Sequence, residues 1–228
     1  STAVQQGEAR ERGKVVFVFP GQGSRGHWPT MGRALLAQSP AFAEAVAACD
    51  AALRPLTGWS VLAVLRGDAG EHVPSLDHGE VIQDVVQPAL FAMSVGLAAV
   101  WRAQGIEPAA VVGHSQGEAA AAHVAGIISL QEAATIIARR SQLLNRLTGK
   151  VAMVLVEQPL AEVERRLRPF GAALSIAAVN ASSSTVVAGD KVAADELLAT
   201  LTAEGVECRK IVAENASHCA QVEAILPE

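Results

Sequence analysis

The sequence predicts an α/β protein in which a parallel-sheet core carries a smaller inserted module. Between residues 14 and 149, short β-branched runs alternate with longer runs of helical spacing, which is typical of a parallel sheet covered by helices. From residue 151 onward the order becomes strand, helix, strand, strand, helix, strand, which is the order of a ferredoxin-like module. With 228 residues, half of them hydrophobic, the chain can bury the core of one large or two unequal domains.

The first part of the chain is expected to contain two strands with helices around them. Residues 14–20 are β-branched and aromatic and run into a glycine-rich loop, so they are predicted to form a buried strand. Ser39 and Pro40 suit the N-cap and first position of a helix. The polar stretch 67–84 is expected to be a loop. The other expected elements are helices at 31–36, 40–53, 85–103, 116–126 and 129–147 and a strand at 109–112.

In the second part we expect strands at 151–156, 173–179, 185–188 and 207–212 and helices at 160–167 and 192–203. Because the chain has already begun a larger domain and has to return to it, this module is expected to be an insert. The predicted division is a linker or N-terminal extension at 1–13, a large subdomain at 14–150 and 213–228, and a ferredoxin-like small subdomain at 151–212.

Composition and charge exclude several classes of function. The net charge is −5 and the basic residues are scattered, which argues against nucleic-acid binding. No uninterrupted apolar stretch approaches the roughly 20 residues that span a bilayer, and charged residues at positions 8–14 argue against a signal peptide, so we expect a cytoplasmic protein with no membrane partner. The three cysteines are widely spaced and suggest neither a disulfide framework nor a metal site, although Cys219 directly follows His218.

The pentapeptide GHSQG at 113–117 is the most informative motif. A GxSxG sequence between a predicted strand and a predicted helix is typical of a nucleophile elbow, in which glycines permit close backbone approach and the serine is presented beyond the sheet. The N-terminal amides of the following helix would then face an oxyanion formed at Ser115. The alternative is an ordinary glycine-serine loop in which Ser115 is a helix N-cap.

A serine nucleophile needs a base, and histidine is the usual one. His218 is the best candidate because it lies just past the last strand of the insert, where the chain re-enters the large domain. His114 adjoins the serine and is expected to point elsewhere, into a substrate pocket. The remaining histidines lie in polar loops or within a predicted helix and are interpreted as solvated or structural; they are His27, His72, His78 and His123.

Further motifs occur in a fixed order along nearly the whole chain: VVFVFPGQGS at 15–24, VQPALF at 86–91, GHSQGE at 113–118, Arg-Ser at 140–141 and Ala-Ser-His at 216–218. In this order they resemble those of the malonyl-CoA:acyl-carrier-protein transacylase family, and the chain is similar to the acyltransferase domain of a modular polyketide synthase. The resemblance implies an α/β-hydrolase-like large domain with a parallel sheet.

The resemblance also implies a ping-pong acyl transfer. Ser115 would be acylated by an acyl-CoA donor, and His218 would act as general base and then as general acid. The oxyanion hole would be formed by the backbone amides of Gln22 and Gln116. The acceptor would be the phosphopantetheine thiol of an acyl carrier protein, within a synthase whose neighbouring domains are further partners. The resemblance implies no bound cofactor.

Arg140 matches the arginine that binds the substrate carboxylate in this family, which suits a planar guanidinium; otherwise it would be a helix-surface cation. In this family the unbranched malonyl type tends to have phenylalanine before the histidine, and Ser217 leaves that space open. Residues 84–87 and Gln116 also resemble the family's branched-substrate pattern, so a methylmalonyl-type extender unit is favoured. Asn215 replaces the usual tyrosine, which keeps ethylmalonyl or a larger branch open. Gln87 and His114 complete the expected substrate-binding set.

The sequence departs from the family in a longer loop after the GQG motif and in its end at residue 228, ahead of the family's usual end. We therefore expect a fragment that lacks the C-terminal part of the large subdomain. Two other functions stay open: a serine esterase or thioesterase, and a catalytically silent scaffold module of a megasynthase.

Overall fold

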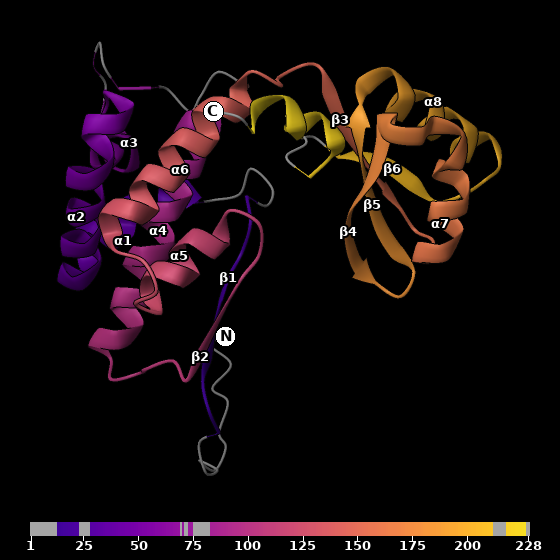
Figure 1. Cartoon of the computed structure of the whole chain (residues 1–228). Helices are drawn as coiled ribbons and strands as arrows, with labels where there is room; N and C mark the ends of the chain where they lie inside the picture. Colours follow the sequence, from indigo (N-terminus) through magenta and orange to yellow (C-terminus); the bar gives the residue numbers. More distant parts are fainter. Residues whose placement is uncertain are drawn as a thin grey trace, which may run out of the picture.

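The computed structural model describes residues 13–22, 28–68, 70, 73–74, 83–211 and 218–226. Two bodies are visible in Figure 1, with the helices and the β1–β2 pair in one and an antiparallel sheet with its helices in the other. In the first body, β1 (Val16–Phe19) and β2 (Ala110–Gly113) pair in parallel, with Phe19 opposite Gly113. Both predicted strands are confirmed, and they end side by side. The expectation that the first strand is buried is wrong, because Val16 and Val18 are 48% and 68% exposed and only Phe19 is buried.

Helices of the first body pack around a core that is centred on α4. The helices described here are α1 (Trp28–Gln38), α2 (Pro40–Thr57), α3 (Val61–Arg66), α4 (Gln83–Ala103), α5 (Gly117–Val124) and α6 (Leu130–Asn145). Helix α4 contacts α2, α5 and α6. Gly96 of α4 lets Phe42 of α2 approach closely, since a Cβ there would lie 2.6 Å from the Phe42 ring. This helix therefore fixes the positions of its neighbours.

Helix α4 is long and apolar. By length and composition it could cross a bilayer, and 56% of its apolar window is buried inside the fold. Its apolar run is interrupted by polar residues such as Gln87 and Ser94, in agreement with the expectation that no uninterrupted stretch of about 20 apolar residues occurs. Burial against neighbouring helices accounts for its apolar character, as in the core helix of a globular domain.

Helix ends follow the local sequence. Ser39 is the N-cap of α2, and its side chain accepts a hydrogen bond from the Phe42 amide at 3.3 Å, as predicted. Helix α5 begins at Gly117, one residue later than expected, because Gln116 is its N-cap. The six-residue helix α3, capped by Ser60, was missed because it is too short to show a helical period.

The second body has the predicted ferredoxin-like order. Its elements are β3 (Val151–Val156), α7 (Leu160–Leu167), the 3-10 helix η1 (Arg168–Ala173), β4 (Leu174–Ala181), β5 (Ser184–Asp190), α8 (Lys191–Ala203) and β6 (Cys208–Ile211). The sheet order is β4-β5-β3-β6, and every neighbouring pair is antiparallel. Its two α-helices pack on the sheet over a core that includes Val154, Val163 and Leu201.

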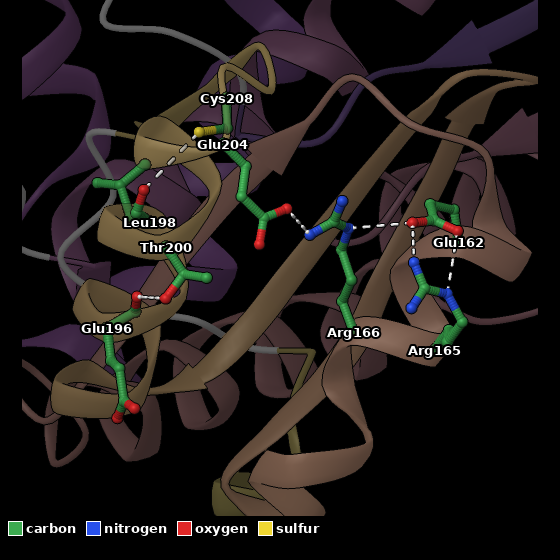
Figure 2. Close-up of polar contacts among 8 residues, drawn as sticks. All are labelled: Glu162, Arg165, Arg166, Glu196, Leu198, Thr200, Glu204 and Cys208. Atoms are coloured by element: carbon green, nitrogen blue, oxygen red, sulfur yellow. Dashed lines mark hydrogen bonds and ion pairs between the residues drawn. The ribbon is translucent and has the colours of Figure 1, made fainter.

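Ion pairs join the helical layer of this module (Figure 2). Arg166 of α7 contacts Glu162 at 3.3 Å and Glu204, just past α8, at 2.6 Å. Arg165 pairs with the same Glu162. Only 17% of the Arg166 side chain is exposed, so this arginine links the end of α7 to the end of α8 with restricted freedom.

A small apolar cluster joins the two bodies. The last described segment, the 3-10 helix η2 (Ala220–Ile225), contacts α6 and β5. Ile225 packs with Leu144 and Leu147 at the end of α6 and with Val151 and Ala188 of the small module. This cluster holds the segment that directly follows His218.

Candidate active site

The turn between β2 and α5 is a strained elbow at Ser115. Ser115 has a φ of 53°, and no other described non-glycine residue has a positive φ. Such a conformation is uncommon for a residue with a Cβ and persists where the surrounding structure enforces it. The amide of His114 donates to the Phe19 carbonyl at 2.9 Å, and the Gly117 amide donates to the His114 carbonyl at 2.9 Å. These bonds fix the elbow against the end of β1.

Both glycines of the GxSxG motif are required by close approach. A Cβ on Gly117 would lie 2.6 Å from the Pro20 carbonyl oxygen and closer still to that of Phe19. A Cβ on Gly113 would lie 2.6 Å from the Glu118 amide nitrogen. The alternative of an ordinary N-cap loop is wrong, because Gln116 is the N-cap residue and Ser115 lies on the turn before it.

Ser115 and His218 meet in the folded chain. Ser115 Oγ lies 2.8 Å from His218 Nε2, although 103 residues separate the two positions. With a neutral ring protonated on Nδ1, Nε2 accepts the hydroxyl proton of the serine. Among the other histidines in the described ranges, His123 contacts the Ile128 carbonyl at 3.4 Å through Nδ1, which agrees with a structural role.

The surroundings of His218 favour its neutral form. Burial is the largest cause that lowers the His218 pKa, and the electrostatic effects of Arg140 and His114 lower it further, while Glu118 opposes them. A histidine whose pKa is depressed carries a free Nε2 lone pair at neutral pH. His218 is therefore suited to take a proton from Ser115.

Two backbone amides are available beside the serine. Within the described part of the chain, no hydrogen bond uses the amide of Gln116 or of Gln22. Gln116 lies at the N-terminus of α5, and Gln22 follows the end of β1. Gly21 lets this loop approach the elbow, since a Cβ on Gly21 would lie 2.8 Å from His114 Nδ1 and 3.3 Å from the His114 carbonyl oxygen. Amides at these positions could receive an oxyanion.

Arg140 is held beside the site by a buried amide. It lies on α6, and its Nη1 donates to Gln87 Oε1 of α4 at 2.8 Å. Burial lowers the pKa of Arg140, and the Glu118 charge opposes this shift, but a guanidinium stays protonated in proteins. The ion pairs found among the described residues do not include Arg140, so its charge is available to an anion.

Two expected site residues, Asn215 and Ser217, lie outside the described residues, as do His27, His72 and His78. Sequence reasoning missed Gln83, which is 2% exposed and accepts a hydrogen bond from Gln87 at 2.9 Å. It was missed because the helix was expected to begin at residue 85, which placed Gln83 in the stretch predicted to be a loop, whereas α4 begins at Gln83.

An apolar cavity of about 750 Å³ runs along β1 and reaches the loop at Gly21 and Gln22. Its walls come from β1, α4 and Met31, and they do not include Ser115, His218 or Arg140. The cavity is therefore separate from the hydrogen-bonded pair of Ser115 and His218.

The elbow predicts the effect of adding one methyl group. Gly117→Ala should destabilise the protein by about 1–3 kcal/mol through overpacking, and it should slow the labelling of Ser115 by a fluorophosphonate because the elbow has to shift. Gly13→Ala is the control, because no atom lies within 4 Å of its added Cβ. Denaturant unfolding and mass spectrometry measure both effects. Equal behaviour of the two variants would contradict the packing argument.

The electrostatics predict a pH dependence. Labelling of Ser115 should fall as the pH drops through the His218 pKa, which lies below the usual histidine value of about 6.5. Arg140→Gln removes a charge that lowers this pKa, so the loss should begin at a higher pH, whereas Glu118→Gln should shift it to a lower pH. Arg139→Gln, with an exposed side chain, is the matched control. Identical profiles for wild type and Arg140→Gln would refute this coupling.

Solved acyltransferase domains share this fold. The acyltransferase domain from module 8 of the salinomycin polyketide synthase superposes with a TM-score of 0.83 at 48% sequence identity, over 93% of this chain and 48% of that one. A loading acyltransferase from the avermectin modular polyketide synthase gives a TM-score of 0.83 at 47% identity, over 92% and 65% of the two chains. The α/β fold class predicted from sequence is confirmed.

Sequence comparisons agree with the structural ones. The chain is 47% identical over 226 residues to polyketide synthase GfsB of Streptomyces halstedii, covering 99% of this chain and 4% of that protein. It thus spans a small part of the curated relatives that it matches. The model of the acyl transferase domain family matches residues 16–228. The chain therefore belongs to the acyl transferase domain family and is similar throughout to the acyltransferase domains of modular polyketide synthases.

Proposed function

We propose that the chain transfers an α-branched carboxyacyl group, methylmalonyl first and ethylmalonyl or larger as the alternative, from CoA to the phosphopantetheine thiol of an acyl carrier protein. The observation that carries the proposal is the 2.8 Å contact between Ser115 Oγ and His218 Nε2 on a strained elbow. The free amides beside it and the nearby guanidinium of Arg140 fit a charged acyl thioester.

In the first half-reaction, His218 Nε2 takes the Ser115 proton as Oγ attacks the thioester carbonyl carbon. The amides of Gln116 and Gln22 stabilise the negative charge that develops on the carbonyl oxygen. When the tetrahedral intermediate collapses, the carbon–sulfur bond breaks, and the departing thiolate takes the proton from His218. The products are the seryl ester and free CoA.

The second half-reaction runs the same chemistry in reverse with a new thiol. His218 takes the proton of the phosphopantetheine thiol, and the sulfur attacks the carbonyl carbon of the seryl ester. The bond between that carbon and Oγ then breaks, and His218 returns the proton to Ser115. The enzyme ends unchanged, because a base that accepts a proton in one step donates it in the next.

Arg140 gives the proposed preference for carboxyacyl substrates. Gln87 occupies Nη1 of its guanidinium, and the other N–H groups can donate to a carboxylate. Asn215, Ser217, Gln87 and His114 complete the proposed acyl pocket. The preference for an α-branch rests on the residue types at 215 and 217 and on the resemblance of residues 84–87 and Gln116 to the branched-substrate pattern.

The proposed setting follows from the substrates. CoA thioesters and carrier-bound phosphopantetheine are the donor and the acceptor, and neighbouring domains of a polyketide synthase are the remaining partners. We place this reaction in the cytoplasm and propose no role for nucleic acid, a membrane or a bound cofactor.

Mass spectrometry of the intact protein tests the acyl transfer. Incubation with methylmalonyl-CoA should add one methylmalonyl group, and the adduct should pass to a phosphopantetheinyl carrier protein. Ser115→Ala should form no adduct. Rapid loss of the adduct as free acid with or without a carrier would indicate a thioesterase, and a wild-type protein that forms no adduct would indicate a silent scaffold module.

Arg140→Ala tests the carboxylate contact. The variant should lower kcat/KM for methylmalonyl-CoA roughly 10- to 100-fold, because a hydrogen bond to a charged group contributes about 1.5–3 kcal/mol. Propionyl-CoA, which lacks the carboxylate, should be affected far less. Arg139→Ala is the control, since it removes the same charge from an exposed neighbour. Equal losses on both substrates would exclude the contact.

A further inference from the structure

We propose that Gln83 is a positioning residue that fixes the amide orientation of Gln87 and thereby the guanidinium of Arg140. The inference rests on the proposed function, because Arg140 is taken to bind the substrate carboxylate. Gln83 and Gln87 lie one turn apart at the start of α4 and are 2% and 3% exposed. Buried amides are costly unless their polar atoms are paired, so these contacts constrain both side chains.

The oxygen and the nitrogen of the Gln87 side-chain amide have different hydrogen-bond partners. Its Oε1 accepts from Arg140 Nη1 at 2.8 Å. Its Nε2 donates to Gln83 Oε1 at 2.9 Å and approaches Gln22 Oε1 at 3.4 Å. A flipped amide would set its N–H groups against the guanidinium donors and its oxygen against two carbonyl oxygens. The Gln83 oxygen, at the shorter distance, is the main acceptor that prevents the flip.

Gln83 is itself anchored to the helix that carries Arg140. Its backbone amide donates to Asn145 Oδ1 at 3.2 Å, and Asn145 is the last residue of α6. The main chain of Gln83 is thus tied to α6 while its side chain holds Gln87 of α4. This closes a loop of contacts through both helices, so the position of Arg140 depends on the first turn of α4.

The same amide reaches the proposed oxyanion loop. Gln22 contributes its backbone amide to the oxyanion site in the proposed mechanism, and its side-chain Oε1 faces Gln87 Nε2 at 3.4 Å. The side chain of Gln87 therefore lies between the carboxylate-binding group and the oxyanion-binding loop. A fixed amide keeps the spacing between these two groups constant, as is needed to hold one substrate by both its carboxylate and its thioester.

Gln83→Leu tests the role, because leucine keeps an apolar volume and lacks the acceptor. We expect KM for methylmalonyl-CoA to rise roughly 3- to 10-fold, the range for one lost hydrogen bond, with kcat/KM for propionyl-CoA changed less than about twofold. Gln83→Glu retains an acceptor oxygen and should restore the KM. Met93→Leu is the control, since it alters another buried residue of α4 outside the amide chain.

A second readout follows the position of Arg140 without any acyl substrate. If Gln83→Leu releases Arg140 from the site, the fall in Ser115 labelling by a fluorophosphonate at low pH should begin at a higher pH. This is the direction expected for Arg140→Gln. Met93→Leu should leave that pH unchanged. A merely structural role of Gln83 would reduce Ser115 labelling at every pH and would not change the pH at which labelling begins to fall.

The outcomes separate this inference from the proposed function. A wild type that forms no adduct on Ser115 with either methylmalonyl-CoA or ethylmalonyl-CoA would overturn the function and, with it, the role of Gln83. A normal adduct with unchanged KM and pH profile in Gln83→Leu would overturn only the role of Gln83. Equal losses on both substrates would also overturn it. If Gln83→Leu does not fold, Gln83→Asn replaces it. The asparagine side chain is one methylene shorter, so its amide does not reach Gln87, and the same changes in KM and pH profile are expected.

Discussion

The close approach of Gly117 to the end of β1 is the constraint on which the candidate site depends. The backbone of α5 lies against the carbonyls of Phe19 and Pro20 with no space for a Cβ. The loop that carries Gln22 lies beside the same elbow, since Gly21 is in close contact with His114. The positive φ of Ser115 follows from the same packing, since the chain has to reverse direction within one residue. The strain at Ser115 is compensated by the bonds that lock the turn.

The second requirement is that His218, which is far from Ser115 along the chain, lies beside the elbow. The topology of the small module contributes to this placement. Because β3 and β6 are antiparallel neighbours, Met153 near the start of the module lies opposite Ile211 at its end. The chain therefore leaves and re-enters the first body at adjacent points. The contacts of Ile225 with α6 and β5 then hold η2, and His218 lies immediately before it.

Much of this arrangement could be predicted, because regular elements with clear periodicity dominate the chain. The strand at 151–156 and the helix at 160–167 were predicted to the residue. Short elements such as α3 and η2 could not be recognised, since they contain too few residues to show a period. For the site, the motif predicted the elbow from local sequence. The two arginines at 139 and 140 could not be told apart by spacing, and only tertiary burial separates the exposed Arg139 from the half-buried Arg140. Gln83 was missed for a related reason: a glutamine in the first turn of a helix is usually solvated, and its partners are defined by how α4 packs on α6.

The electrostatics connect the substrate to the base. In the free protein, Arg140 lowers the pKa of His218, which keeps the imidazole neutral and able to accept a proton. A carboxylate that binds Arg140 would offset this positive charge and allow the His218 pKa to rise. The histidine would then be a stronger base when a carboxyacyl thioester is in place than when a substrate without a carboxylate occupies the site. Arg140 and His218 would thus favour carboxyacyl substrates over other acyl substrates in two ways. The first is the direct contact of Arg140 with the carboxylate, and the second is the higher proton affinity of His218. This second effect depends on the distance between guanidinium and imidazole, and that distance is maintained by the buried amides of Gln83 and Gln87.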